Sequence, residues 1–496
     1  MTPIEKSRWQ PWIELGLALL MGLIASVMLP PLLGEDLVVR QVARVYAPLA
    51  AHLHGEGRRD EISVLLIDDK TLADAGEAWP ASYRYQSRLL AAVALYKPRA
   101  VFFDIVFSNA RPDTSLPSLI DALCRVQAGG TKVYLAAQRQ ADGRFMLRPE
   151  LEAVEGRCYE KVAIEYQPDA VDQTAWTYQL NDGLRLKDAP RSAALAMYEN
   201  ENGPLPASAD RSDLALTWGL VPAEHGVAWS SAPKKHDDRQ DEEREEKGGS
   251  ATQEGYCRPS MSAVAETLPG FIRNRLMSDA EKKVCVFNTT LYPADLVTST
   301  DAEEAFVKTR LEGRFVMIGT ALQGSNDRVQ SPIHGRIPGV YLHAAALGNL
   351  LDDGADYKQA TELGFPGDWP HIKVWLVLLI GLFPVLAVGA LRRSAWGKSI
   401  VEWICKGKAH PPSDETRFGK LSRKARETLG WIGWKSIVFA SSFLLVSVLL
   451  FIGQSLLDVG FMTVIDVAVF SLAAEWFEWN FKLFAWWQDK PDAAEH

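Results

Sequence analysis

The sequence has few cysteines and lacks the short motifs of several common enzyme and metal-protein classes. Only five cysteines occur in 496 residues, and no combination of Cys and His has the spacing of a zinc site. No serine lies in the Gly-x-Ser-x-Gly pattern of a nucleophile elbow, and the chain has no internal repeat. These absences argue against zinc proteins, serine hydrolases and repeat proteins. Any chemistry therefore has to come from side chains that the fold brings together.

The apolar residues are segregated, although charged residues make up 23% of the chain as in an ordinary soluble protein. Four stretches are long and apolar enough to cross a bilayer core of roughly 30 Å. They are 15–33, 374–391, 436–457 and 459–475. The first could instead be a cleaved signal peptide, but no A-x-A-like site follows it closely. The fourth contains Asp466, so a re-entrant or interfacial segment is the alternative there.

Basic residues indicate how these spans are oriented. The segment 392–435 contains eleven Lys or Arg against four acidic residues, an excess that is typical of a cytoplasmic loop. We therefore predict a multi-pass protein of the cell inner membrane with both ends in the cytoplasm. The predicted parts are a cytoplasmic N-terminus (1–14), a transmembrane helix (15–33), an extracytoplasmic domain (34–370), a transmembrane helix (374–391), a cytoplasmic loop (392–435), two transmembrane helices (436–457 and 459–475) and a cytoplasmic tail (476–496).

The outer domain alternates short apolar strands with amphipathic helices. Strands are predicted at 61–67, 99–103, 132–136 and 314–320, and helices at 82–96, 115–126, 192–198 and 340–351. This alternation predicts an α/β domain with a mainly parallel sheet that is covered on both faces. The run 234–250 has no apolar residue, so we predict a disordered loop there, with an acidic interaction segment as the alternative.

Four of the cysteines lie in the outer domain, where an oxidising compartment would allow them to pair. They are Cys124, Cys158, Cys257 and Cys285. Four thiols permit two disulfides in any of three pairings. Buried free thiols are the alternative, because a domain of this size can fold around its core without a disulfide.

Acidic side chains follow several of the predicted strands. Because the carboxyl ends of parallel strands share one edge of a sheet, we expect these residues and two nearby polar ones to form a ligand site. The candidates are Asp68, Asp69, Asp104, Thr320, Asp327 and His343. A divalent cation, Ca²⁺ or Mg²⁺, could bind to the carboxylates of Asp68, Asp104 and Asp327. The alternative is that each Asp is only a helix cap or turn residue.

Several short pieces of the outer domain form an ordered set. They are Ile62-Ser-Val-Leu-Leu-Ile-Asp-Asp69, Trp79-Pro80, Arg88-Leu-Leu90, Lys97-Pro-Arg-Ala-Val-Phe-Phe-Asp104, Gly313-Arg-Phe-Val-Met-Ile-Gly-Thr320, Asp327 with Ser331-Pro332, and Pro338-Gly-Val-Tyr-Leu-His-Ala344. Along 34–351 this set resembles the type-two CHASE domain, a sensory module of bacterial receptors that is also typically followed by three spans. The chain departs from the family pattern at Tyr83 and Gln86, where an Arg and a His are usual, and at Tyr341 and Ala345, where Glu and Asn are common.

The resemblance implies that the outer domain detects an extracytoplasmic signal and relays it to a cyclase or kinase. The predicted cytoplasmic parts are shorter than the roughly 100 residues that a catalytic output domain needs, so we expect a separate membrane or cytoplasmic partner to carry the output. The chain is then a binding protein for an unknown small ligand, without enzyme activity or nucleic-acid binding. The alternatives are an extracytoplasmic metal-dependent hydrolase and a structural component of an envelope complex.

Overall fold

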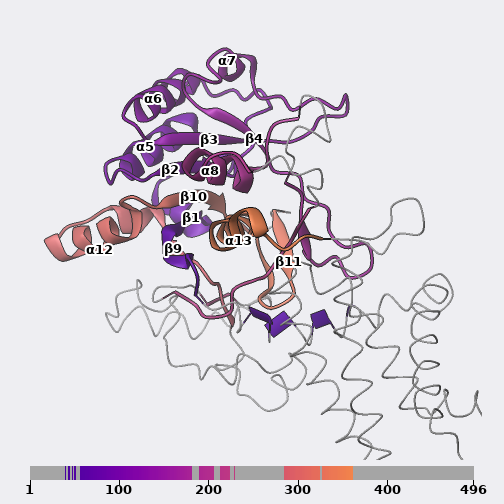
Figure 1. Ribbon diagram of the computed structural model, residues 1–496. Coiled ribbons are helices and arrows are strands. Elements are labelled where there is room, and N and C mark those ends of the chain that lie inside the picture. The colour runs from indigo at the N-terminus through magenta and orange to yellow at the C-terminus, as the bar shows by residue number, and fades with distance from the viewer. Residues whose placement is uncertain are drawn as a thin grey trace, which may run out of the picture. The chain divides into compact units, whose positions relative to one another are not determined.

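A six-stranded parallel sheet forms the centre of the described structure (Figure 1). This computed structural model describes residues 56–180, 189–205, 213–223, 228–229, 284–323 and 327–360, and seven helical residues between 40 and 51. The strand order is β4-β3-β2-β10-β1-β9, and every neighbouring pair is parallel. The strands are β1 (Ile62–Ile67), β2 (Ala100–Phe103), β3 (Lys132–Ala137), β4 (Glu160–Ala163), β9 (Thr289–Leu291) and β10 (Phe315–Thr320). The predicted α/β domain with a mainly parallel sheet is therefore confirmed.

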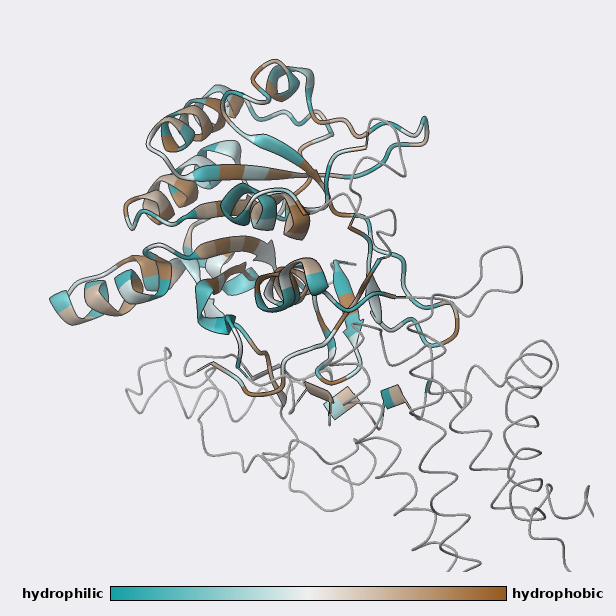
Figure 2. Ribbon diagram, in the orientation of Figure 1, coloured by the Kyte–Doolittle hydropathy of each residue, from teal (hydrophilic) through white to brown (hydrophobic). Residues whose placement is uncertain are grey.

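Helices cover both faces of this sheet, as its buried strands require. The helices α5 (Tyr83–Ala94) and α6 (Leu116–Ala128) pack together on one face. On the other face, α8 (Ala193–Asn202) packs against α13 (Val340–Asp353), and α13 lies on β1 and β10. Figure 2 shows the helices banded in brown and teal, as expected of helices that bury one side only.

Successive residues of each strand alternate between the two faces. On β2, Val101 and Phe103 belong to the core beneath α5 and α6. The side chain of Phe102 points the opposite way and meets His343 of α13 edge to face, with ring centroids 5.3 Å apart. Buried side chains therefore cover both faces of the sheet. On the face under α13 they lie next to a polar residue of that helix, His343.

Shorter elements connect this framework. They are η1 (Arg59–Glu61), α4 (Asp69–Asp74), α7 (Pro149–Glu152), η2 (Pro293–Leu296), α12 (Asp301–Leu311), η3 (Gly354–Asp356), and the two-stranded sheets of β11 (Arg328–Ser331) with β12 (Gly335–Pro338), β5 (Thr177–Tyr178) with β6 (Leu214–Ala215), and β7 (Ala228–Trp229) with β8 (Val284–Cys285). Thr300 begins α12 with a capping box, in which its hydroxyl accepts from the backbone N–H of Glu303.

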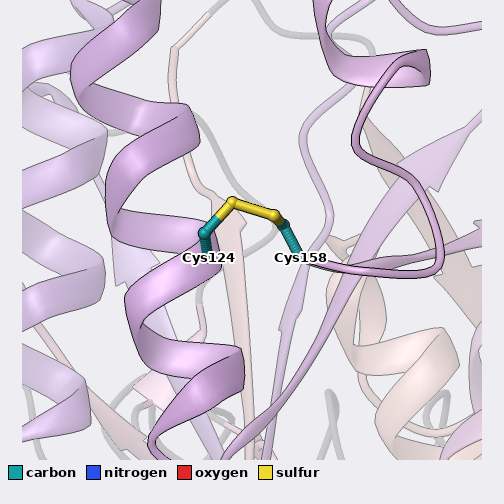
Figure 3. The surroundings of a disulfide bond; sticks show 2 residues. All are labelled: Cys124 and Cys158. Atoms are coloured by element: carbon teal, nitrogen blue, oxygen red, sulfur yellow. A yellow bond between two sulfur atoms is a disulfide. The ribbon is translucent and has the colours of Figure 1, made fainter.

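A disulfide joins Cys124 of α6 to Cys158, which lies just before β4 (Figure 3). This bridge occurs in one of the three pairings that the sequence left open. Cys285 is also disulfide-bonded, whereas Cys257 lies outside the described residues. The Cys124–Cys158 bridge closes a separation of 34 residues and ties the outer part of the sheet to the helix that covers it.

The chain divides into two units. One is Arg44–Gln359, and the other consists of Met1–Ala43 together with Ala360–His496. Within the described residues, none of the helices is long and apolar enough to cross a bilayer. The stretches that we predict as spans, 15–33, 374–391, 436–457 and 459–475, lie outside the described residues, as does the predicted loop 234–250.

Candidate ligand-binding site

A cavity of about 790 Å³ opens at the carboxyl ends of β2 and β10. This is the edge at which open α/β sheets bind their ligands, and the volume lies in the range of small-molecule sites. Asp104 follows β2 and Thr320 ends β10, while Gln138 and Glu165 come from the segments after β3 and β4. One edge of the parallel sheet thus contributes most of the polar wall.

Three carboxylates line this cavity, those of Asp104, Glu165 and Asp327, and Glu165 forms an ion pair with Arg139 at 3.3 Å. Asp104 is only 8% exposed, and its Oδ2 has no hydrogen-bond partner among the described residues. Burial and the negative charge of Asp327 raise the pKa of Asp104 well above its usual range. Burial also raises the pKa of Asp327, and a hydrogen bond donated by the Thr320 hydroxyl (3.3 Å) opposes that rise. The pair of Asp104 and Asp327 therefore binds a proton more tightly than two solvated carboxylates would.

A buried histidine lies behind Asp104. Burial lowers the pKa of His343 to about 3, so its imidazole is neutral at physiological pH. Its Nδ1 shares a 2.8 Å hydrogen bond with the Tyr178 hydroxyl. When Tyr178 donates, the remaining ring hydrogen is on Nε2, which faces Asp104 Oδ1 at 3.8 Å. That distance is too long for a hydrogen bond, so His343 is a neutral polar neighbour of Asp104 and leaves its charge uncompensated.

Two glycines allow α13 to lie against the site. A Cβ on Gly319 of β10 would come within 2.5 Å of the Val340 Cβ, and a Cβ on Gly339 would come within 2.3 Å of Asp327 Oδ1. The first contact lets the helix start close to the strand, and the second lets the Asp327 carboxylate lie against the helix N-terminus. The backbone N–H of Gly339 also donates to the Asp327 carbonyl at 3.2 Å. The position of Asp327 is thus coupled directly to the start of α13.

The structure brings only some of the predicted site residues together. Asp104, Thr320 and Asp327 line the cavity, and His343 lies behind them. Asp68 instead caps α4, because its carboxylate accepts from the Thr71 N–H at 2.7 Å.

The other predicted carboxylate near β1 is also engaged elsewhere. Asp69 accepts from the Gln323 N–H at 2.7 Å, and the cavity lining includes neither Asp68 nor Asp69. Across the described parts of the chain, no group of three or more His, Cys, Asp or Glu side chains could hold a metal ion. The Ca²⁺ or Mg²⁺ site at Asp68, Asp104 and Asp327 therefore has no structural support, and it stays a prediction.

Several lining residues were not predicted from the sequence. Trp79 and Pro80 lie at the cavity, joined by a cis peptide bond, and their presence among the pieces that resemble the CHASE domain was the available signal. Tyr166 comes from the irregular segment after β4, and Gln179 directly follows the two-residue strand β5. No periodicity marks either segment, so no sequence pattern could have placed them.

The comparisons with known proteins agree with this architecture. The CHASE2 domain family matches residues 18–385 of the chain. The chain belongs to the CHASE2 family. CHASE2 domains are extracytoplasmic sensory domains rather than catalytic ones. Neither the curated proteins nor the solved structures contain a match to this CHASE2 chain.

Proposed function

We propose that this CHASE2 protein is a membrane-anchored sensor. In this proposal a small ligand occupies the cavity outside the cytoplasm, and the segments predicted as transmembrane helices pass its occupancy to a separate output partner, a kinase or a cyclase. The observation that carries the proposal is the cavity itself, with a buried carboxylate oxygen that has no partner among the described residues. The sensory character of the family favours this function over a hydrolase.

The helix α13 provides a physical connection between the cavity and the ends of the domain. It begins next to Asp327, and all of its residues from Val340 to Leu351 are buried. A helix of this length spans roughly 20 Å. Because a packed core is not continuously deformable, a displacement at the first turn is expected to move the helix as a unit.

The far end of α13 meets the segment with which the domain begins. Asp352 Oδ1 accepts from the Arg58 N–H at 2.7 Å, and the Arg58 guanidinium donates to the Leu351 carbonyl at 3.4 Å. Residue 58 follows the first predicted span along the chain, and α13 precedes the second one. Movement of α13 would therefore act on both connections to the membrane at one point.

The test is whether the cavity controls an output activity. The full chain is purified from its own cells in mild detergent, and kinase and nucleotide-cyclase activities are measured in the purified material. We expect one of these activities to accompany the wild-type chain and to change in Asp104→Asn.

A matched control is Asp121→Asn, which makes the same substitution at an exposed position of α6 and is expected to match the wild type. The proposal is wrong if neither activity accompanies the chain, or if the two variants behave identically.

A further inference from the structure

The charge of the cavity wall is mainly negative. Its acidic residues are Asp104, Glu165 and Asp327, against a single basic residue, Arg111. Glu165 is already paired with Arg139 at 3.3 Å. The guanidinium of Arg111 donates to the Ala81 carbonyl at 3.2 Å, and it lies over the ring of Tyr83. Both of these charges are thus engaged in the wall, whereas Asp104 presents a buried acceptor that no described residue satisfies.

Apolar and aromatic surface forms the rest of the wall. It includes Pro80, Ile105, Val106 and Ile164, together with the rings of Trp79 and Tyr166. The side chain of Trp79 is unusually exposed for its size, at 41%. Aromatic ring faces attract cations, and apolar walls favour a ligand with a carbon body.

A bare metal ion does not suit this arrangement. Calcium requires six to eight oxygen ligands at about 2.3–2.6 Å, and no described group of three acidic or histidine side chains could hold an ion. A cavity of about 790 Å³ that is partly apolar is also far larger than an ion needs. The remaining cations are organic ones.

A neutral ligand could form a hydrogen bond with Asp104 but could not neutralise the negative charge of the site. A hydroxyl group could donate to Asp104, but it would leave the repulsion between the two carboxylates unrelieved. An ammonium group donates hydrogen bonds and also neutralises that repulsion, and charge-assisted hydrogen bonds are the stronger kind.

We infer that the cavity binds a small organic ammonium compound, with its N–H groups on the carboxylates of Asp104 and Asp327 and its carbon body against Trp79 and the apolar wall. This inference rests on the proposed function, because the ammonium compound would be the signal that the sensor detects. Binding replaces the proton held by the carboxylate pair, because burial raises the pKa of both carboxyl groups and the charge of Asp327 raises that of Asp104 further. The affinity should therefore increase as the pH rises through the pKa of the pair and fall as the pH is lowered.

The test is calorimetric titration of the full chain in detergent. The probes are a series of primary alkylamines and arylalkylamines, each matched with the alcohol of the same carbon skeleton. We expect at least one amine to bind roughly tenfold or more tightly than its alcohol, with an affinity that rises with pH. Asp104→Asn should reduce the amine to the affinity of the alcohol, and Asp121→Asn should leave it unchanged. If Asp104→Asn fails to fold, the amine–alcohol comparison and the pH dependence in the wild type still test whether the cavity binds an ammonium group.

Three results would overturn the inference. They are the absence of binding by any amine, equal binding of an amine and its alcohol, and an amine affinity that Asp104→Asn does not change. In a further experiment, CaCl₂ or MgCl₂ is titrated alone, and the amine is then titrated in the presence of the metal. Metal binding that competes with the amine would favour a metal site instead.

Failure of the ligand class and failure of the sensor function are distinguishable. If an alcohol binds as tightly as its amine, the cavity still binds a ligand and only the ammonium class is wrong. If the amine binds as expected but leaves the accompanying kinase or cyclase activity unchanged, the ligand class stands and the sensor function fails.

Discussion

Replacement of Asp104 by Asn is expected to stabilise the protein at neutral pH and to have little effect in acid. Burial and the charge of Asp327 raise the pKa of Asp104 in the folded state, whereas the unfolded value is about 3.9. Below the unfolded pKa both states hold the proton, so the carboxyl group costs nothing. As the pH rises towards the folded pKa, only the unfolded state releases its proton, and the free energy of unfolding falls.

The size of this effect follows from a single proton. Each pH unit between the unfolded and the folded pKa removes up to about 1.4 kcal/mol from the wild type relative to the variant. Asn occupies nearly the same volume and cannot ionise. Removing the charge of residue 104 also relieves Asp327, which changes stability in the same direction.

The assay is thermal unfolding of the full chain in detergent, at a series of pH values from about 4 to 8. For a chain of this size, 1 kcal/mol corresponds to a shift in Tm of roughly 2 °C. The difference in Tm between Asp104→Asn and the wild type should therefore grow with pH and level off above the folded pKa. Asp121→Asn serves as the control and should follow the wild type. Parallel curves for Asp104→Asn and the wild type across the whole range would refute the reasoning.

Three further predictions concern the disulfide, the topology and the start of α13. Replacing both Cys124 and Cys158 by Ser should lower the free energy of unfolding by about 4 kcal/mol in the loop-closure account, and no loss of Tm under non-reducing conditions would contradict it. Reporter fusions at Lys247 and Arg417 should indicate opposite sides of the membrane, and two cytoplasmic signals would refute the predicted layout. Gly339→Ala should weaken amine binding about tenfold in calorimetric titration, because the new Cβ displaces the Asp327 carboxylate. Its Tm should change little, because the φ of −58° at this position suits Ala. Unchanged affinity would refute this prediction.

The long strands could be predicted because both faces of the sheet are buried. A strand such as Ile62–Ile67 is buried at every position, so it forms a continuous apolar run in the sequence. The edge strands β4 and β9 have only four and three residues, with polar side chains among them. The strand β2 is also four residues long but entirely apolar, whereas these two segments do not form an apolar run, so they were not predicted.

The candidate site could be predicted only where sheet topology determines position. Asp104 and Thr320 come together because β2 and β10 are parallel neighbours. Asp68 follows β1 in the same way, but its local hydrogen bond to the Thr71 N–H holds it at the start of α4. An aspartate at the end of a strand can either line the cavity or cap the next helix, and the sequence does not distinguish these two roles. Tyr178, which completes the buried hydrogen bond to His343, comes from a two-residue strand that has no sequence signature.

The bridge between Cys124 and Cys158 has a consequence for how copies of this domain meet. It fixes the approach to β4, which is an outer strand of the sheet. The exposed side of such a strand is a template on which another chain can add a strand and begin to aggregate. Here Ala163 of β4 already donates its N–H to the Arg191 carbonyl at 2.9 Å, and the Arg191 guanidinium lies 2.6 Å from Glu160. The crosslink, this backbone hydrogen bond and these charges all lie at the β4 edge, where they oppose the addition of a strand from a second copy.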